Sequence, residues 1–278
     1  MARTTVDGCE LHYEVTGRGE PVLLLHGLGS CSLDWERQKP ALEERYTVIT
    51  LDVRGHGQSG KPRGPYTIGL FARDVAQLLQ KLAVGPVHVV GISMGGMIAF
   101  QLAVDEPRLV RTLTVINSAP AVVPKTFSQW LTLKLRLWMP RLFGLRWLGK
   151  RIAAVNFPRP EQEAERRMLA ERLGNNDPAA YRAATKAILG WSVAERIREI
   201  RCPALVGSGD HDYTPVALKE SYASLMHDAR VAVIADSRHV TTHDQPAALN
   251  RVLLDFLAEH RTASEASALP EARIARSA

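Results

Sequence analysis

Cysteine is scarce in this chain, and its placement excludes two classes of protein. The 278 residues include three cysteines, Cys9, Cys31 and Cys202, which lie far apart and are odd in number. A disulfide-stabilised secreted domain needs paired cysteines, and a structural zinc site needs closely spaced ones. We therefore expect no disulfide framework and no metal site, and the pattern indicates a reducing compartment such as the cytoplasm.

Long apolar runs are also missing. No stretch of 18 consecutive apolar residues occurs, so the sequence predicts no membrane-spanning helix. Residues Met1–Gly8 lack the apolar core that a signal peptide requires. At the other end, residues 262–278 are small and polar with scattered charge, which predicts a disordered tail. The net charge of +6 comes without a basic motif or an aromatic-interleaved sheet pattern, which argues against a nucleic-acid partner.

The most informative stretch is one where an apolar strand runs into a buried helix. Val87–Val90 is an apolar, β-branched run, and Met97–Ala103 is apolar over the length of a helix. Between them stands the pattern Gly91-x-Ser93-x-Gly95. A sharp turn there would push the Ser93 hydroxyl out of the sheet, where a base and a substrate carbonyl could reach it. The alternative is a structural turn whose serine only caps the helix.

A second glycine-rich loop follows another apolar strand. Pro21–Leu25 is continuously apolar, as expected for a strand buried on both faces of a parallel sheet, and His26–Gly29 follows it. Backbone N–H groups in such a loop can point inward. We therefore expect the amides of Leu28 and Met94 to form an oxyanion hole. On its own, the loop could equally be a plain glycine turn.

Strands and helices alternate along the first part of the chain. Cys9–Val15 alternates in polarity and is expected to form an antiparallel hairpin with the preceding residues. Tyr46–Leu51 and Val110–Asn117 are apolar strands, and residues 66–84 have the spacing of a helix with one apolar side. This order is typical of a parallel sheet covered on both faces. His56, in a glycine-rich loop, is expected to be structural rather than catalytic.

Three motifs together resemble the α/β-hydrolase superfamily. They are His26-Gly27-Leu28-Gly29, Asp52-x-Arg54-Gly55-His56-Gly57-x-Ser59 and Gly91-x-Ser93-x-Gly95-Gly96. The first 120 residues are most similar to the branch that holds enol-lactonases, carboxylesterases and cofactor-free haloperoxidases. The resemblance implies an α/β fold with a mostly parallel twisted sheet of about eight strands flanked by helices. It also implies a core made of residues 1–119 and 200–261, with an inserted helical cap over residues 120–199.

The resemblance further implies the other two members of a Ser-His-Asp triad. The register of the family after the penultimate predicted strand places the acid at Asp212, with Asp210 as the alternate. The unused aspartate would form a turn or cap a helix. His239 follows the last predicted strand, where the family carries its base, although Arg238 stands where glycine is frequent. His243 is a competitor that lies later in the sequence.

The cap segment departs from the family pattern. Phe127–Trp138 can be interpreted as a strand or as a helix, and its leucine, lysine and arginine residues favour the helix. Trp130 and Trp138 are interleaved with basic residues there. We expect the apolar stripe of this helix to face Ser93 and line a substrate pocket. The alternatives are packing of the cap onto the core and contact with an anionic membrane surface.

In chain order the predicted triad is Ser93, Asp212 and His239, the order shown by α/β-hydrolases. The resemblance implies a serine hydrolase that cleaves carboxylic esters or lactones through an acyl-enzyme, without a cofactor. Serine at the elbow argues against haloalkane dehalogenases and epoxide hydrolases, which carry aspartate there. Carbon–carbon bond hydrolysis or perhydrolysis on the same triad, and a non-catalytic ligand-binding protein, remain alternatives. The sequence leaves the natural small-molecule substrate and the oligomeric state open.

Overall fold

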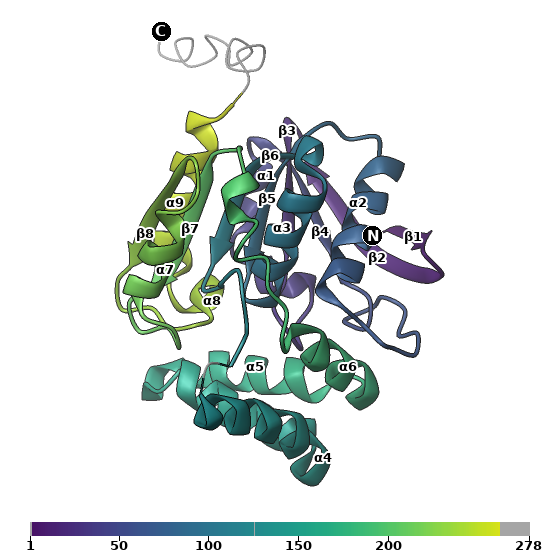
Figure 1. Cartoon of the computed structure of the whole chain (residues 1–278), viewed down its shortest axis with the longest axis vertical. Coiled ribbons are helices and arrows are strands. Elements are labelled where there is room, and N and C mark those ends of the chain that lie inside the picture. The colour runs from purple at the N-terminus through teal and green to yellow at the C-terminus, as the bar shows by residue number, and fades with distance from the viewer. Residues whose placement is uncertain (1, 125, 262–278) are drawn as a thin grey trace, which may run out of the picture.

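The structure is a computed structural model that describes residues 2–124 and 126–261, except for the side chains of residues 128, 129, 132–134 and 136. The strands of this part form one sheet in the order β1-β2-β4-β3-β5-β6-β7-β8 (Figure 1). Their bounds are β1 (Ala2–Val6), β2 (Cys9–Gly17), β3 (Glu20–Leu25), β4 (Tyr46–Leu51), β5 (Val87–Ile92), β6 (Val110–Ile116), β7 (Ala204–Gly209) and β8 (Ala229–Ile234). The tail predicted to be disordered, residues 262–278, lies outside the described residues.

The strand pairing confirms the predicted mostly parallel sheet. β1 pairs with β2, and β2 with β4, in antiparallel orientation, whereas the pairs from β4 onward to β8 are parallel. In the predicted hairpin Val6 lies opposite Cys9. Parallel neighbours require crossover connections, which helices provide here. The carboxyl ends of the parallel strands therefore meet along one edge of the sheet, where their loops can build a site.

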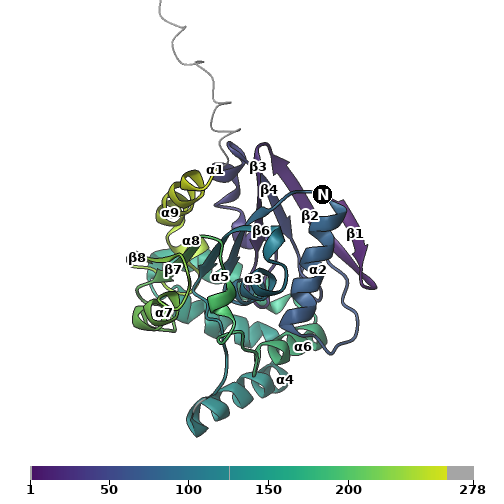
Figure 2. The ribbon, with the colours of Figure 1, turned by 45° about the horizontal axis from the view of Figure 1, so that its top comes forward.

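Helices cover both faces of the sheet (Figures 1 and 2). One apolar cluster joins the sheet to α2, α3 and α7, and another joins it to α1 and α9. The helices outside the cap are α1 (Lys39–Glu43), α2 (Ile68–Lys81), α3 (Met94–Asp105), α7 (Val216–Ala223), α8 (Thr241–Asp244) and α9 (Pro246–Glu259). Every residue of β5 is buried, as expected for a central strand with helices on both sides.

Three further helices lie between β6 and β7 in the sequence, and we call them the cap helices. They are α4 (Phe127–Asn156), α5 (Glu163–Gly174) and α6 (Pro178–Ile188). They form a layer beside one edge of the sheet, with α4 outermost (Figure 1). The prediction of a helix rather than a strand at Phe127–Trp138 is confirmed. α4 consists of two segments, because Gly144 within it has the non-helical angles φ 77° and ψ 163°.

Backbone hydrogen bonds tie the two ends of the cap segment together. Ala121 and Ser192 form an antiparallel bridge. Beside it, the N–H of Val122 donates to the carbonyl of Trp191 at 2.8 Å, and the N–H of Gly190 donates to the carbonyl of Val122 at 2.9 Å. The cap segment therefore leaves and re-enters the core through one short, closed neck.

The three cysteines are all free thiols. No helix in the described part of the chain has the length and apolar character needed to cross a membrane. Among the same residues, no group of three or more His, Cys, Asp or Glu side chains is placed to hold a metal ion.

Candidate active site

Ser93 lies at the sharp turn between β5 and α3. Its backbone has φ 53° and ψ −117°, a conformation that L-residues rarely adopt and that costs about 1–3 kcal/mol. Two hydrogen bonds hold it. The N–H of Ser93 donates to the carbonyl of Ile116 at 2.9 Å, and the hydroxyl of Ser118 donates to the carbonyl of Ser93 at 2.8 Å. The turn expected from the glycine and serine spacing is therefore present, and it directs the Ser93 hydroxyl toward His239.

The glycines on either side of Ser93 are required by close backbone approach. A Cβ atom at Gly91 would overlap the carbonyl of Gly95, and one at Gly95 would overlap the carbonyl of Leu25 at the end of β3. The first turn of α3 can pack against β3 and β5 only because both side chains are absent. This packing brings the N-terminus of α3 to the edge of the sheet where Ser93 lies.

Ser93, His239 and Asp212 form a continuous hydrogen-bonded chain. Nε2 of His239 lies 2.9 Å from Oγ of Ser93, and Nδ1 of His239 lies 2.6 Å from Oδ1 of Asp212. The three residues follow β5, β8 and β7, three strands whose carboxyl ends lie at the same edge of the sheet. A hydroxyl next to an imidazole that a carboxylate orients is the arrangement that activates a serine nucleophile.

Asp212 has a second buried partner that sequence reasoning missed. Nζ of Lys219, on α7, donates to Oδ2 of Asp212 at 2.5 Å and to the carbonyl of Thr214 at 2.6 Å. The Thr214 hydroxyl donates to the same Oδ2 at 2.8 Å. Burial alone would raise the pKa of Asp212, but the hydrogen bonds and positive charges of His239 and Lys219 outweigh burial and hold this pKa well below its usual range. The carboxylate is thus fixed in its ionised form.

We expect Lys219→Met to lower kcat/KM by about 10–100-fold. This range is taken from metal enzymes, in which the removal of a side chain that orients a metal ligand has such an effect; here Lys219 orients Asp212. Without the ammonium group the pKa of Asp212 should rise toward its ordinary range, so the carboxylate would lose its charge at a higher pH. The acidic limb of the pH profile of kcat/KM should therefore move to higher pH. Lys219→Gln, which keeps a hydrogen-bond donor, should lose less activity, and the exposed Lys81→Met serves as the control. A uniform loss with an unchanged pH profile would show that Lys219 acts only on folding.

Asp210, the alternate acid, makes contacts of a different kind. Its two carboxylate oxygens accept the backbone N–H groups of Asp236 and Ser237, each at 2.9 Å. Burial slightly opposes ionisation of Asp210, but these two N–H donors outweigh it and lower the pKa. Asp210 is exposed and joins the loop after β7 to the loop after β8, which is the turn-forming role expected for the unused aspartate.

Two other histidines lie outside the hydrogen-bonded chain. His56 is fully buried and its Nδ1 lies 3.1 Å from the carbonyl of Arg54, while burial and then the nearby His26 lower its pKa to about 3. The structural role expected for His56 agrees with this environment. His243 lies on α8, where its Nε2 is 3.1 Å from Nη1 of Arg172. Burial lowers the pKa of His243 as well, so both rings favour the neutral form.

The two expected oxyanion donors lie next to Ser93. Met94 is the first residue of α3, so its N–H has no carbonyl partner within the helix. Leu28 lines the same cavities as Ser93. The loop that carries Leu28 approaches closely, because a Cβ atom at Gly27 would lie 3.6 Å from Cβ of Ser93. An anionic oxygen in front of Ser93 would therefore meet the positive end of the α3 dipole.

Asn117 and Tyr213 also belong to the site. Nδ2 of Asn117 donates to the carbonyl of His239 at 2.9 Å, and Oδ1 of Asn117 accepts the N–H of Gly209 at 2.9 Å. Asn117 thus links the loop of the imidazole to the end of β7. The ring of Tyr213 stacks on His239 with a centroid distance of 4.3 Å and an angle of 25°. Nδ2 of Asn156, at the end of α4, donates to the Tyr213 hydroxyl at 2.5 Å.

Ser93 lines two cavities. The larger has a volume of about 280 Å³, and Ser93, Asp212 and His239 all line it. Its apolar walls are Met97, Val122, Ile188, Leu189 and Leu218. The smaller cavity, of about 70 Å³, is also lined by Ser93 and His239, together with Ile152, Leu169 and Leu173 of the cap helices. Among the described residues that line the two cavities, none is lysine or arginine.

Trp130 and Trp138 do not lie where the pocket hypothesis placed them. Their exposed fractions are 44% and 55%, and neither lines the cavities at Ser93. The physical reason is the order of layers in the cap. α5 and α6 provide the surface toward the core, so the first segment of α4 is on the outside and its apolar stripe faces solvent. The expectation that these two tryptophans form the substrate pocket is therefore corrected.

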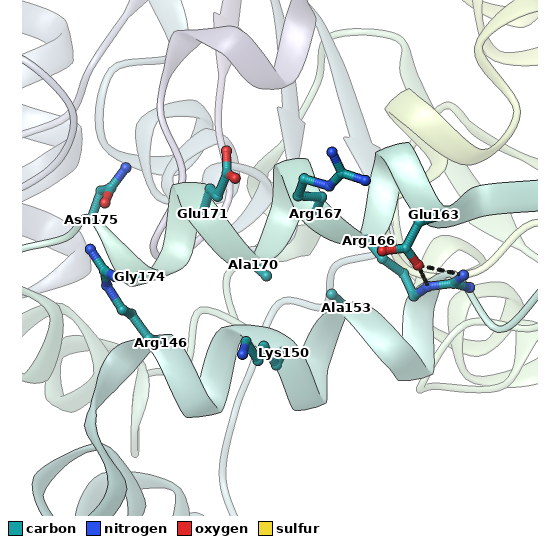
Figure 3. A pocket seen from close by; sticks show the side chains of 10 residues that line it. All are labelled: Arg146, Lys150, Ala153, Glu163, Arg166, Arg167, Ala170, Glu171, Gly174 and Asn175. Carbon is teal, nitrogen blue, oxygen red and sulfur yellow. Dashed lines mark hydrogen bonds and ion pairs between the residues drawn. The ribbon is translucent and has the colours of Figure 1, made fainter.

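A third cavity, of about 560 Å³, lies between α4 and α5 (Figure 3). Arg146 and Lys150 come from α4, and Arg166 is held by Glu163 of the same helix in an ion pair of 2.8 Å. Ser93, Asp212 and His239 do not line it. This cavity is therefore separate from the hydrogen-bonded chain.

The comparison with known proteins decides the family. The family model for the alpha/beta hydrolase fold matches residues 20–246. The chain belongs to the alpha/beta hydrolase family. One alpha/beta hydrolase relative, described as a candidate carbamate hydrolase, RutD, from Azorhizobium caulinodans, is 31% identical over 262 residues, which cover 90% of this chain and 96% of that protein.

Solved structures of this family agree in fold with the present chain. The enol-lactonase from Burkholderia xenovorans LB400 has a TM-score of 0.84 and 27% identity, covering 92% of this chain and 100% of the other. A thermophilic esterase from Thermogutta terrifontis has a TM-score of 0.82 and 25% identity, covering 94% and 97%. This alpha/beta hydrolase is thus similar to the branch that its sequence motifs resemble, and the named activities of these relatives are hydrolytic.

Proposed function

We propose that the protein hydrolyses uncharged carboxylic esters or lactones of small molecules through a covalent acyl-enzyme. The observation that carries the proposal is the position of the His239 imidazole, with one nitrogen 2.9 Å from the Ser93 hydroxyl and the other 2.6 Å from Asp212. In this proposal Ser93 is the nucleophile, His239 the base and Asp212 the orienting acid.

In the first half of the proposed reaction, Oγ of Ser93 attacks the ester carbonyl carbon while Nε2 of His239 takes its proton. Asp212 keeps Nδ1 protonated and stabilises the imidazolium that forms. The amides of Leu28 and Met94 donate to the oxyanion of the tetrahedral intermediate, and one such donor contributes about 2.7–4 kcal/mol. His239 then gives its proton to the leaving alkoxide, and the alcohol departs, leaving an ester of Ser93.

In the second half, water replaces the alcohol. Nε2 of His239 takes a proton from the water as it attacks the carbonyl of the acyl-enzyme, and the same oxyanion donors act again. The intermediate collapses, the proton returns to Oγ of Ser93, and the carboxylic acid is released. In a lactone the alcohol and the acid belong to one molecule, so a hydroxy acid is the product.

The substrate class follows from the two cavities. Their described lining contains no lysine or arginine, so a carboxylate on the substrate would lose its hydration without gaining a counter-charge. The larger cavity has apolar walls and about 280 Å³, which suits a short acyl chain. The relatives broaden the set of bonds to test, because their names include an enol-lactonase, an esterase and a candidate carbamate hydrolase.

A substrate series tests this function. We expect kcat/KM for p-nitrophenyl esters to rise from acetate through butyrate and to fall for long acyl chains, because a cavity of about 280 Å³ has room for a short chain only. Methyl pentanoate should be cleaved faster than monomethyl succinate, a charged ester of similar length. Lactones and a phenyl carbamate are measured beside them with the purified full-length protein. If the protein hydrolysed the carbamate but none of the esters or lactones, the proposed substrate class would be wrong and carbamates would take its place.

The alternative hypotheses give different results in the same series. A non-catalytic binding protein would bind these esters without releasing acid, and the Ser93→Ala variant would behave like the unchanged protein. A perhydrolase would release acid slowly but transfer the acyl group to hydrogen peroxide. Product analysis by mass spectrometry distinguishes the peracid from the acid.

A further inference from the structure

The first segment of α4, residues 127–143, exposes many of its apolar side chains. Of its described side chains, none is buried. The large apolar side chains that are exposed by 42–75% are Phe127, Trp130, Leu131, Leu135, Trp138, Leu142 and Phe143. Most of them are separated by three or four residues, so they form one stripe along the helix. A helix of this kind gains stability by packing its apolar stripe, and an exposed stripe of this size marks an interaction surface.

The charge of α4 indicates what covers this stripe. From Phe127 to Asn156 the helix contains no aspartate or glutamate. Its first segment has the basic residues Lys134, Arg136 and Arg141; the second has Arg151, and also Arg146 and Lys150, which line the cavity between α4 and α5. The Arg141 guanidinium lies 5.7 Å from the centroid of the Trp138 ring, and that of Arg151 lies 5.4 Å from the ring of Trp147. Cations are therefore placed directly beside the aromatic rings. A partner that is complementary to these cations and rings has anionic groups at its surface and an apolar layer below them.

We propose that α4 docks the protein on an anionic phospholipid surface, with the helix lying in the plane of the membrane interface. Tryptophan rings favour the headgroup level of a bilayer, and a basic helix with one apolar side binds at the boundary between headgroups and acyl chains. α4 is the outermost element at its end of the molecule (Figures 1 and 2), so a flat surface can reach it. The proposal does not depend on the reaction carried out at Ser93.

Vesicle binding tests the proposal with the full-length protein. At low salt we expect binding to vesicles of equimolar phosphatidylcholine and phosphatidylglycerol, and none to phosphatidylcholine alone. High salt should release the protein, because the attraction between cations and lipid headgroups is screened. On binding, brominated lipids in the same vesicles should quench the tryptophan emission. Equal binding to both kinds of vesicle, or no binding to either, would overturn the proposal.

Matched variants locate the binding surface. Leu131→Ser combined with Trp138→Ser removes two members of the stripe and should reduce the bound fraction at least about tenfold. Arg141→Glu should weaken binding by more than about fivefold, the effect of one interfacial cation. The controls are Leu225→Ser, whose exposed fraction of 42% equals that of Leu131, and Arg108→Glu at the opposite edge of the sheet. Equal loss in the controls would contradict the proposal.

The competing partner is a second copy of the chain on the same stripe. Light scattering of the protein without lipid distinguishes the two. A monomer that binds anionic vesicles supports the membrane surface. A stable dimer that the Leu131→Ser, Trp138→Ser double variant converts to monomers would assign the stripe to self-association and overturn the proposal. All substituted residues are exposed, so unchanged thermal unfolding checks that each variant is folded.

Discussion

Replacing Ser93 with alanine should lower the turnover of an activated ester by roughly 10⁶-fold, the loss measured when the nucleophile of a comparable triad is removed. The reason is that His239 would then face a methyl group, and no oxygen would be left to carry the acyl group. Substrate binding should change little, because the two cavities keep their walls. The measurement is kcat with a p-nitrophenyl ester, compared at equal concentrations of folded protein.

A covalent label gives the Ser93 prediction a second readout. An organophosphonate should add once to the unchanged protein, and peptide mass spectrometry should find the adduct on Ser93. Ser221→Ala, which changes an exposed serine on α7, is the matched control and should keep full activity and labelling. Near-normal turnover in Ser93→Ala would remove the basis of the proposed mechanism.

Replacing Asp212 with asparagine should reduce kcat by about 10⁴-fold. An asparagine amide can donate to the imidazole and so favours the wrong tautomer, in which Nε2 carries the proton and cannot accept one from Ser93. Lys219 would also lose its buried negative partner, so some loss of stability is expected. The pH dependence of kcat and the thermal unfolding midpoint separate the two effects.

Asp210→Asn is the matched control for the acid. Its carboxylate accepts two backbone N–H groups and does not contact His239, so we expect a loss of less than about tenfold in kcat. A modest drop in thermal stability is expected instead, because the loops after β7 and β8 lose two charge-assisted hydrogen bonds. If Asp210→Asn were the more damaging variant, the acid would be misassigned, while Ser93 and His239 would keep their proposed roles.

Local patterns in the sequence were sufficient to locate the elbow and the sheet. The glycines around Ser93 must be small because backbone atoms approach there, and this requirement is visible as a short motif. The strands β3, β4 and β5 are mainly apolar because helices cover both faces of the sheet there. His239 was predicted through the family resemblance, because it follows the last predicted strand, where the family carries its base.

Contacts between distant segments could not be read from the sequence. Lys219 belongs to a helix that begins after Asp212, and no local spacing shows that its ammonium group folds back onto the carboxylate. Tyr213 and Asn156 are 57 residues apart, and their contact depends on how the end of α4 meets the loop after β7. A lysine on a helix, or a tyrosine in a loop, is more often a surface residue than part of a site.

The direction of the α4 stripe was the main error of the sequence interpretation. Periodicity shows which residues share one side of a helix, and Trp138, Leu131 and Leu135 have the spacing of one side and are all exposed. It does not show what that side contacts, because this depends on the other elements packed nearby. α5 and α6 already occupy the layer next to the core, so the stripe of α4 is turned to the outside.

The closed neck between Ala121 and Ser192 has an evolutionary consequence. Because the segment that forms the cap helices starts and ends at the same antiparallel bridge, one continuous stretch of coding sequence could be exchanged while both flanking strands keep their positions. Ser93, Asp212 and His239 all lie outside that stretch. Substrate range and the proposed membrane affinity could then diverge between descendants of this chain by replacement of a single module, without a change in the residues proposed to cleave the bond.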